Sequence, residues 1–120
     1  MVSKLLKILA LGVFLTLNLN AKTIKEGVLT IATEGTYAPF TYHDKDGKLT
    51  GYDVEVTRAV ADKLGIKVEF KETQWDSMMA GLKAGRFDVV ANQVGLTSPE
   101  RQATFDKSEP YSWSGAVLVA

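Results

Sequence analysis

The alternation of short apolar runs with amphipathic helical stretches limits most strongly how this chain can fold. Residues 28–32 form a nearly continuous apolar run rich in β-branched side chains, which is typical of a buried strand. Similar patterns predict further strands over residues 67–71, 87–91 and 115–120, and helices over residues 53–64, over 76–84 and from Ser98 onward. Strands that alternate with helices imply an α/β fold with a mostly parallel sheet flanked by helices.

The predicted helix over residues 53–64 has an apolar face and a clear end. Val56, Ala59, Val60 and Leu64 recur at intervals of three and four residues, so they share one side of the helix. Gly65 is expected to end the helix, because glycine readily adopts the left-handed conformation found there. The four apolar residues therefore form one face of the predicted helix.

Local signals predict one hairpin and two helix starts. Asp46-Gly47 is a strong turn signal, so residues 41–50 are predicted to form a short hairpin. Asp76 can cap the second helix, and Ser98 followed by Pro99 is typical of the start of another.

The first 21 residues have the layout of a secretory signal peptide. Lys4 and Lys7 precede an apolar run over residues 8–17, and Ala21 can occupy the last position before cleavage. An uncleaved membrane anchor is the alternative, although the run is short for a span. No cysteine follows for lipid attachment, and no twin arginine is present. The mature chain is thus expected to be periplasmic and to begin at Lys22.

Charge and composition argue against several classes of function. The chain carries 14 basic and 14 acidic residues, and removal of Lys4 and Lys7 with the signal peptide leaves 12 against 14. A nucleic-acid partner normally requires a basic excess. With no cysteine and with His43 as the one histidine, no catalytic triad is indicated, and residues 44–47 lack the later ligands of a calcium loop. We expect no enzymatic activity, metal or cofactor.

Ligands of parallel sheets bind at the carboxyl ends of the strands. The loops in that position are residues 34–40, 73–75 and 92–97. Two of them carry Tyr37 and Trp75, whose flat faces suit aliphatic stems, sulfur and cations. Core packing is the alternative fate of these two aromatic side chains.

Several short motifs occur in a fixed order along the chain: residues 33–40, 51–56, 75–76, 80–82, 85–88, 92–94 and 110–111. Together they closely resemble family 3 of the bacterial extracellular solute-binding proteins, over residues 24–120. The resemblance implies the periplasmic-binding-protein type II fold, in which two lobes close on a ligand. Residues 22–120 are then expected to form the first lobe. Because the apolar run 115–120 is followed by no turn, we expect the sequence to be cut short near the hinge.

The resemblance also implies roles for individual residues. Arg101 corresponds to the arginine that binds the ligand carboxylate, and Tyr37 and Trp75 correspond to the aromatic residues that sandwich the ligand side chain. Relatives usually read Thr-x-x-Arg, whereas Thr97 here lies four residues before Arg101. Either Ser98 replaces the usual threonine or one residue is inserted.

Four further residues are candidates for polar contacts with the ligand. Glu34 matches an acidic position that, in relatives for basic amino acids, meets the distal amine, and the second ammonium of cystine could take its place. Backbone carbonyls near Gln93 and Gly95 could accept from the α-ammonium group. The pair Asn92-Gln93 is similar to the cystine-binding branch, and pairing of these two amides with neighbouring backbone is the alternative.

The function implied by the resemblance is capture of a free amino acid, cystine first and other polar or basic amino acids after it. The protein would be the monomeric, periplasmic solute-binding component of an ABC transporter and would deliver its ligand to the membrane permease. Two alternatives stay open. One is an enzyme on the same scaffold, a dehydratase or a lytic transglycosylase, and the other is a ligand-sensing receptor module.

Overall fold

The computed structural model describes residues 22–120, so the predicted signal peptide over residues 1–21 lies outside the described residues. A parallel sheet lies at the centre and has the strand order β4-β1-β5. Its strands are β1 (Val28–Thr33), β4 (Lys67–Glu72) and β5 (Val89–Val90). The expectation of an α/β fold with a parallel sheet is confirmed.

Strand β1 forms the middle of this sheet and the centre of the core. It pairs with β4 along its whole length, from Val28 opposite Lys67 to Thr33 opposite Glu72. Ile31 and Ala32 pair with β5 on the other side and are fully buried. A strand that is covered on both faces needs apolar residues at successive positions, which explains why the run is continuous rather than alternating.

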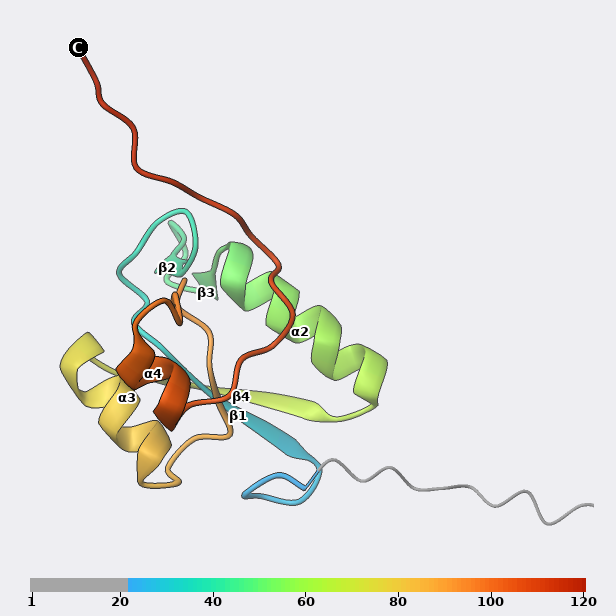
Figure 1. Ribbon diagram of the computed structural model, residues 1–120. Coiled ribbons are helices and arrows are strands. Elements are labelled where there is room, and N and C mark those ends of the chain that lie inside the picture. Colours follow the sequence, from blue (N-terminus) through green and yellow to red (C-terminus); the bar gives the residue numbers. More distant parts are fainter. Residues whose placement is uncertain (1–21) are drawn as a thin grey trace, which may run out of the picture.

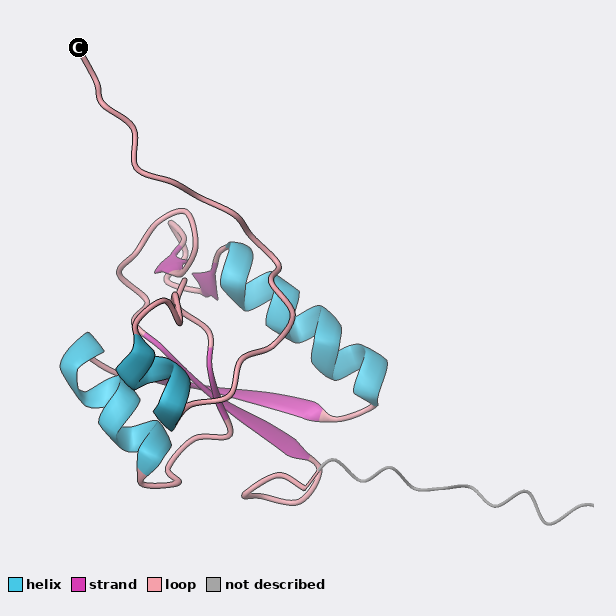
Figure 2. Ribbon diagram, viewed as in Figure 1, coloured by secondary structure: helices cyan, strands magenta, loops and turns pink. Residues whose placement is uncertain are grey.

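Helices cover both faces of the sheet (Figure 1, Figure 2). Helix α2 (Tyr52–Leu64) lies on one side of the strands, and α3 (Trp75–Lys83) and α4 (Pro99–Thr104) lie on the other. Among residues 22–120, none of the helices combines the length and the apolar character that a membrane crossing needs.

Helix α2 ends as predicted but buries a different face. Gly65 adopts the left-handed conformation with φ 68° and caps the helix. The buried residues are Asp53, Val54 and Ala61, whereas Val60 is 48% exposed. Of the four residues on the predicted apolar face, Val56 is half-buried, and Ala59, Val60 and Leu64 are exposed.

Apolar residues occur on more than one side of α2, and the sheet covers only one of these sides. The side that carries Val56 and Val60 is left partly exposed. Val56 and Val60 line a groove of about 300 Å³ that runs beside β5. Leu82 of α3 and Leu96 lie along the same groove.

The starts of α3 and α4 differ in how well the sequence predicts them. Helix α3 begins at Trp75, so Asp76 lies inside its first turn and is not the cap. Helix α4 begins as predicted, with Pro99 in its first turn and the Ser98 hydroxyl accepting a hydrogen bond from the backbone N–H of Arg101 at 3.2 Å.

Two predicted strands are shortened or missing. Strand β5 spans two residues, and the carboxylate of the preceding Asp88 accepts hydrogen bonds from the backbone N–H groups of Thr30 and Ile24 at 2.7 and 2.8 Å. Residues 115–120 form no strand; they extend away from the other elements, and Leu118 is fully exposed (Figure 1).

The predicted hairpin is confirmed as β2 (Tyr42–His43) and β3 (Leu49–Thr50). Its turn is held by the Asp44 carboxylate, which accepts hydrogen bonds from the backbone N–H groups of Asp46 and Lys48, both at 2.9 Å. The Asp44 side chain therefore closes the turn.

Candidate ligand-binding site

The loops that follow β1, β4 and β5 leave the same edge of the sheet, because the three strands are parallel. These are residues 34–41, 73–74 and 91–98 of the described chain. In Figure 1 they gather around the first turns of α3 and α4. All eight predicted site residues therefore lie at this edge: Glu34, Tyr37, Trp75, Asn92, Gln93, Gly95, Thr97 and Arg101.

Asn92 joins the loop after β1 to the loop after β5. Its side chain is 2% exposed and its Oδ1 accepts from the backbone N–H of Glu34 at 2.9 Å and from Thr33 Oγ1 at 3.2 Å. Its Nδ2 donates to Glu34 Oε2 at 2.8 Å. Both ends of the Asn92 amide are thus used inside the protein, where they fix the half-buried Glu34 carboxylate.

Two buried hydroxyls continue this network beneath the first loop. Thr33 Oγ1 lies 2.7 Å from Thr41 Oγ1, which in turn accepts from the backbone N–H of Gly35 at 3.1 Å. Gly35 has φ 74°, where a residue with a side chain would be strained, and a Cβ there would also displace the Glu72 carboxylate, whose Oε1 would lie 2.3 Å away. The loop is therefore anchored by side chains at both ends.

His43 ties the hairpin to the same edge. Its Nε2 lies 2.9 Å from Glu72 Oε1, and its Nδ1 lies 3.2 Å from the carbonyl oxygen of Gly35. The two ring nitrogens thus face two different oxygen atoms, one on the Glu72 side chain and one on the Gly35 backbone. His43 thus braces the first loop against the end of β4, a role that its sequence neighbours do not indicate.

Arg101 and Trp75 come together from two helices. The guanidinium carbon of Arg101 lies 5.6 Å from the centre of the Trp75 ring, within cation–π range. A guanidinium nitrogen of Arg101 also donates to the carbonyl oxygen of Gly95 at 3.2 Å. Trp75 and Arg101, both half-buried, are hereafter called the Trp75–Arg101 platform.

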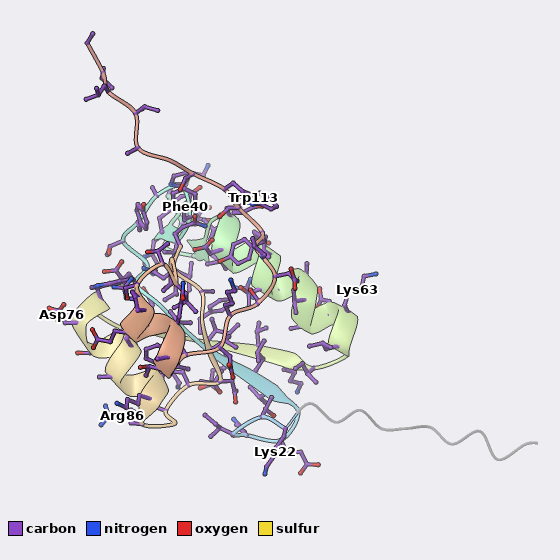
Figure 3. The ribbon with its side chains drawn as sticks, in the orientation of Figure 1. Lys22, Phe40, Lys63, Asp76, Arg86 and Trp113 are labelled. Carbon is purple, nitrogen blue, oxygen red and sulfur yellow. The ribbon has the colours of Figure 1, made fainter. Side chains whose placement is uncertain are left out.

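This platform borders a groove of about 590 Å³ between α3 and α4. Asp76, Ser98 and Glu100 line the groove near the strand ends, and Met79, Lys83 and Phe105 line it farther along the helices. The other six predicted site residues are not among those that line it. Figure 3 marks the two ends of α3: Asp76 lies at one end and Arg86 at the other.

Tyr37 and Thr97 stand apart from the platform. The Tyr37 ring is 45% exposed and packs edge-on against Phe40, with the ring centres 5.1 Å apart. Thr97 is exposed and directly precedes the Ser98 cap. Tyr37 and Thr97 are therefore both open to solvent.

Gln93 has two partners that sequence reasoning missed. Its backbone N–H and its side-chain Nε2 donate to the carboxylate of Asp53, at 2.7 and 2.5 Å. Asp53 is completely buried in the first turn of α2. Burial, together with the adjacent Asp53 carboxylate, raises the pKa of the Tyr111 phenol above its usual value of 10. An acidic residue in the first turn of a helix is common, because the helix dipole favours it there. Nothing about Asp53 in the sequence therefore indicated that it binds Gln93, 40 positions away.

Comparison with known proteins gives a consistent result. The family model of the bacterial extracellular solute-binding proteins, family 3, matches residues 29–120. The L-cystine-binding protein TcyA of Bacillus subtilis is 67% identical over 96 residues, covering 79% of this chain and 35% of that protein. The unliganded, open L-cystine solute receptor of Neisseria gonorrhoeae superposes with a TM-score of 0.72 and 93% identity, over 73% of this chain and 37% of that one. The chain spans little more than a third of the length of these relatives.

Two more distant matches bear on what such a lobe can do. A cyclohexadienyl dehydratase of Pseudomonas aeruginosa is 34% identical, over 82% of this chain and 36% of that enzyme. An arginine-bound form of domain 1 from TmArgBP is 26% identical, with a TM-score of 0.67 over 72% of this chain and 66% of that one. The scaffold therefore occurs in an enzyme as well as in binding proteins, and one isolated domain of a relative carries a ligand.

The matched family covers most of the chain, and the structural neighbours share its parallel sheet and flanking helices. On this evidence the chain belongs to family 3 of the bacterial extracellular solute-binding proteins and has the periplasmic-binding-protein type II fold.

Proposed function

We propose that residues 22–120 form one half of a cleft that binds a free amino acid, with L-cystine as the preferred ligand. The observation that carries the proposal is the Trp75–Arg101 platform at the carboxyl edge of a parallel sheet. A guanidinium offers a planar pair of donors to a carboxylate, and the adjacent indole offers a flat face to an aliphatic or sulfur-containing side chain. The high identity to proteins named for cystine binding supports the choice of ligand.

The remaining groups suit the other parts of a zwitterion. The Glu34 carboxylate is held by Asn92 and can accept from an ammonium group. The exposed ring of Tyr37 supplies a second aromatic face at the same edge. The carbonyl oxygen of Gly95 already accepts from Arg101, so it positions the guanidinium and its second lone pair remains for the ligand.

In the complete protein we infer that a second lobe closes over this half-site by a hinge motion. The loaded protein would serve as the periplasmic component of an amino-acid ABC transporter and pass its ligand to the membrane permease. The names of the relatives support this assignment. We further propose that the protein acts as a monomer, that residues 1–21 are the signal for export, and that it catalyses no reaction.

The test is a titration of the ¹⁵N-labelled chain with L-cystine, L-arginine and glycine, followed by amide chemical shifts. Cystine is expected to shift amides in residues 34–40 and 92–101. Arg101→Ala should weaken binding by about 100-fold, since a hydrogen-bonded charge pair contributes about 1.5–3 kcal/mol. Arg101→Lys should retain part of the affinity because it keeps the charge and loses the planar fork.

Arg86→Ala is the matched control, since Arg86 is exposed and lies at the opposite end of α3 from Asp76 (Figure 3). It should leave the dissociation constant within about twofold, in line with the small effect of a distant surface charge. If the Arg101→Ala variant binds L-cystine as tightly as the wild type does, Arg101 takes no part in binding. Turnover of a prephenate-like acid by the chain would instead favour the dehydratase alternative.

A further inference from the structure

We propose that Gln93 is a positioning residue through which the buried Asp53 holds two segments at once: the loop after β5, and the segment by which the chain leaves the lobe. The second segment is fixed at Ser112. We call the three residues the Asp53–Gln93–Ser112 clasp. The inference deepens the proposed function, because the loop after β5 belongs to the proposed half-site.

The first part of the clasp is a buried carboxylate with fitted donors. Asp53 has no exposed surface, and removal of a carboxylate from water is unfavourable unless donors replace the lost hydration. Gln93 supplies two donors, its backbone N–H at 2.7 Å and its side-chain Nε2 at 2.5 Å. The position of Asp53 in the first turn of α2 adds the positive end of the helix dipole.

The second part is the backbone of Gln93. It has φ 51°, which makes it the one non-glycine residue with a positive φ among residues 22–120. Such a conformation costs about 1–3 kcal/mol and persists only where surrounding contacts impose it. Both contacts that impose it here come from Asp53, so this carboxylate sets the direction in which the loop after β5 continues toward Gly95 and Arg101.

The third part is the segment that leaves the lobe. Ser112 Oγ donates to Gln93 Oε1 at 3.0 Å, and the Tyr52 hydroxyl donates to the backbone carbonyl of Tyr111 at 2.7 Å. Beyond this point Trp113 is 83% exposed. Within residues 22–120, Ser112 is the last residue with a side-chain hydrogen bond.

The side chain of Gln93 therefore works in two directions. Its Nε2 donates to Asp53 and its Oε1 accepts from Ser112, a combination that a side-chain amide provides and a carboxylate does not. The amide is committed to the protein, and the backbone of Gln93 is what the loop presents to a ligand. Movement of this loop on ligand binding is then transmitted to the exit segment.

The experiment measures backbone order by ¹⁵N relaxation in the ligand-free chain. In the wild type, the order parameters of Tyr111 and Ser112 should be close to the value of about 0.85 for rigid backbone, and those of residues 115–120 should be low. Ser112→Ala removes the bond between Gln93 and the exit segment and leaves the bond from Tyr52 to the Tyr111 carbonyl in place, and it should lower the order parameter of residue 112 to below about 0.6. Ser108→Ala is the matched control, because Ser108 Oγ donates only to the neighbouring Glu109 carbonyl.

A second variant tests the Asp53 side of the clasp. Gln93→Glu places a carboxylate against the buried Asp53 carboxylate, so at pH 7 both the loop and the exit segment should lose order. Two carboxylates in contact share a proton as the pH falls, so order should return at about pH 5. Far-UV circular dichroism and a cooperative melt establish that each variant is folded. Unchanged order at residues 111–112 in both folded variants would overturn the proposal.

A titration with L-cystine tests the clasp separately from the proposed function. If L-cystine binds, it should shift the Ser112 amide in the wild type and shift it at least twofold less in Ser112→Ala, while loop amides still respond. Equal shifts at residue 112 in the two proteins would contradict the coupling. If cystine does not bind the wild type, the proposed ligand is wrong, and the ligand-free relaxation data still decide whether the clasp exists.

Discussion

Two groups of predicted site residues lie at the same sheet edge and behave differently. Asn92 and Gln93 point into the protein, where their amides bind Glu34 and Asp53. Trp75 and Arg101 form a platform that borders an open groove. We call Asn92 and Gln93, together with Glu34 and Asp53, the internal network, and the second group is the Trp75–Arg101 platform.

The difference separates the predicted site residues into two kinds. Members of the internal network fix where the loops and the Glu34 carboxylate lie, so under the proposed function they act on a ligand only through other residues. Under the same proposal, the members of the platform are the ones that contact the ligand. Substitutions in the internal network should therefore change stability first, and substitutions in the platform should change affinity first.

The largest effect is expected where the internal network is broken. Asn92→Ala would leave the backbone N–H of Glu34 without its acceptor and the Glu34 carboxylate without its donor, and it should lower the free energy of unfolding by about 2–3 kcal/mol. Urea unfolding followed by circular dichroism gives the value. Gln74→Ala is the control, since this exposed amide makes no side-chain capping bond and its loss should cost less than about 0.5 kcal/mol.

Asn92→Asp sharpens the same test. It replaces the donor that faces Glu34 by a carboxylate oxygen, so at pH 7 two negative groups meet where the amide bond measures 2.8 Å. The variant should be less stable than Asn92→Ala at pH 7 and should recover as the pH falls toward 4, because protonation removes the repulsion. Equal stability of both variants at every pH would place Asn92 outside the network.

A smaller effect on folding, and a clear one on affinity, is expected at the platform. Trp75→Ala removes the face against Arg101 and should weaken cystine binding by about tenfold, which is about 1.4 kcal/mol. Its effect on unfolding should be about 1 kcal/mol, the range of an exposed cation–π contact. Trp113→Ala, in the exposed tail, should change neither quantity. A loss of stability without a loss of affinity would place Trp75 with the internal network.

The smallest effect concerns pH and the phenol of Tyr111, which lies beside the internal network. Burial and Asp53 raise the pKa of this phenol in the folded chain, so above about pH 10 the folded state binds more protons than the unfolded state. Stability from this source is present below pH 10 and is lost as the pH rises. Urea unfolding between about pH 9 and pH 11 should show a steeper decline for the wild type than for Tyr111→Phe. Parallel curves would contradict the assignment.

The strand and helix order could be predicted because each element is defined by neighbouring residues. The run that forms β1, the cap at Ser98 and the stop at Gly65 act within a few positions. The buried face of α2 could not be predicted, since its apolar residues extend round more than one side and the buried ones are Val54 and Ala61. Local pattern does not show how far a sheet extends.

The candidate site also has one part that could be predicted from the sequence and one part that could not. The family resemblance predicted ligand contacts for Trp75 and Arg101, and the structure places these two side chains together. The partners of Asn92 and Gln93 could not be predicted, because Glu34 and Asp53 lie 58 and 40 positions away and no local signal links them. Residues 115–120 have the composition of a strand and lack a neighbour to pair with among the described residues.

The place of β1 in the sheet has a consequence for synthesis. This strand leaves the ribosome first, yet its two partners begin at Lys67 and Val89. At about 5–20 residues per second, the nascent chain carries an unpaired, strongly apolar segment for several seconds before either neighbour is available. Non-local parallel pairing of this kind is slow to form. The nascent chain should therefore stay unfolded, and accessible to chaperones, until most of the lobe has been translated.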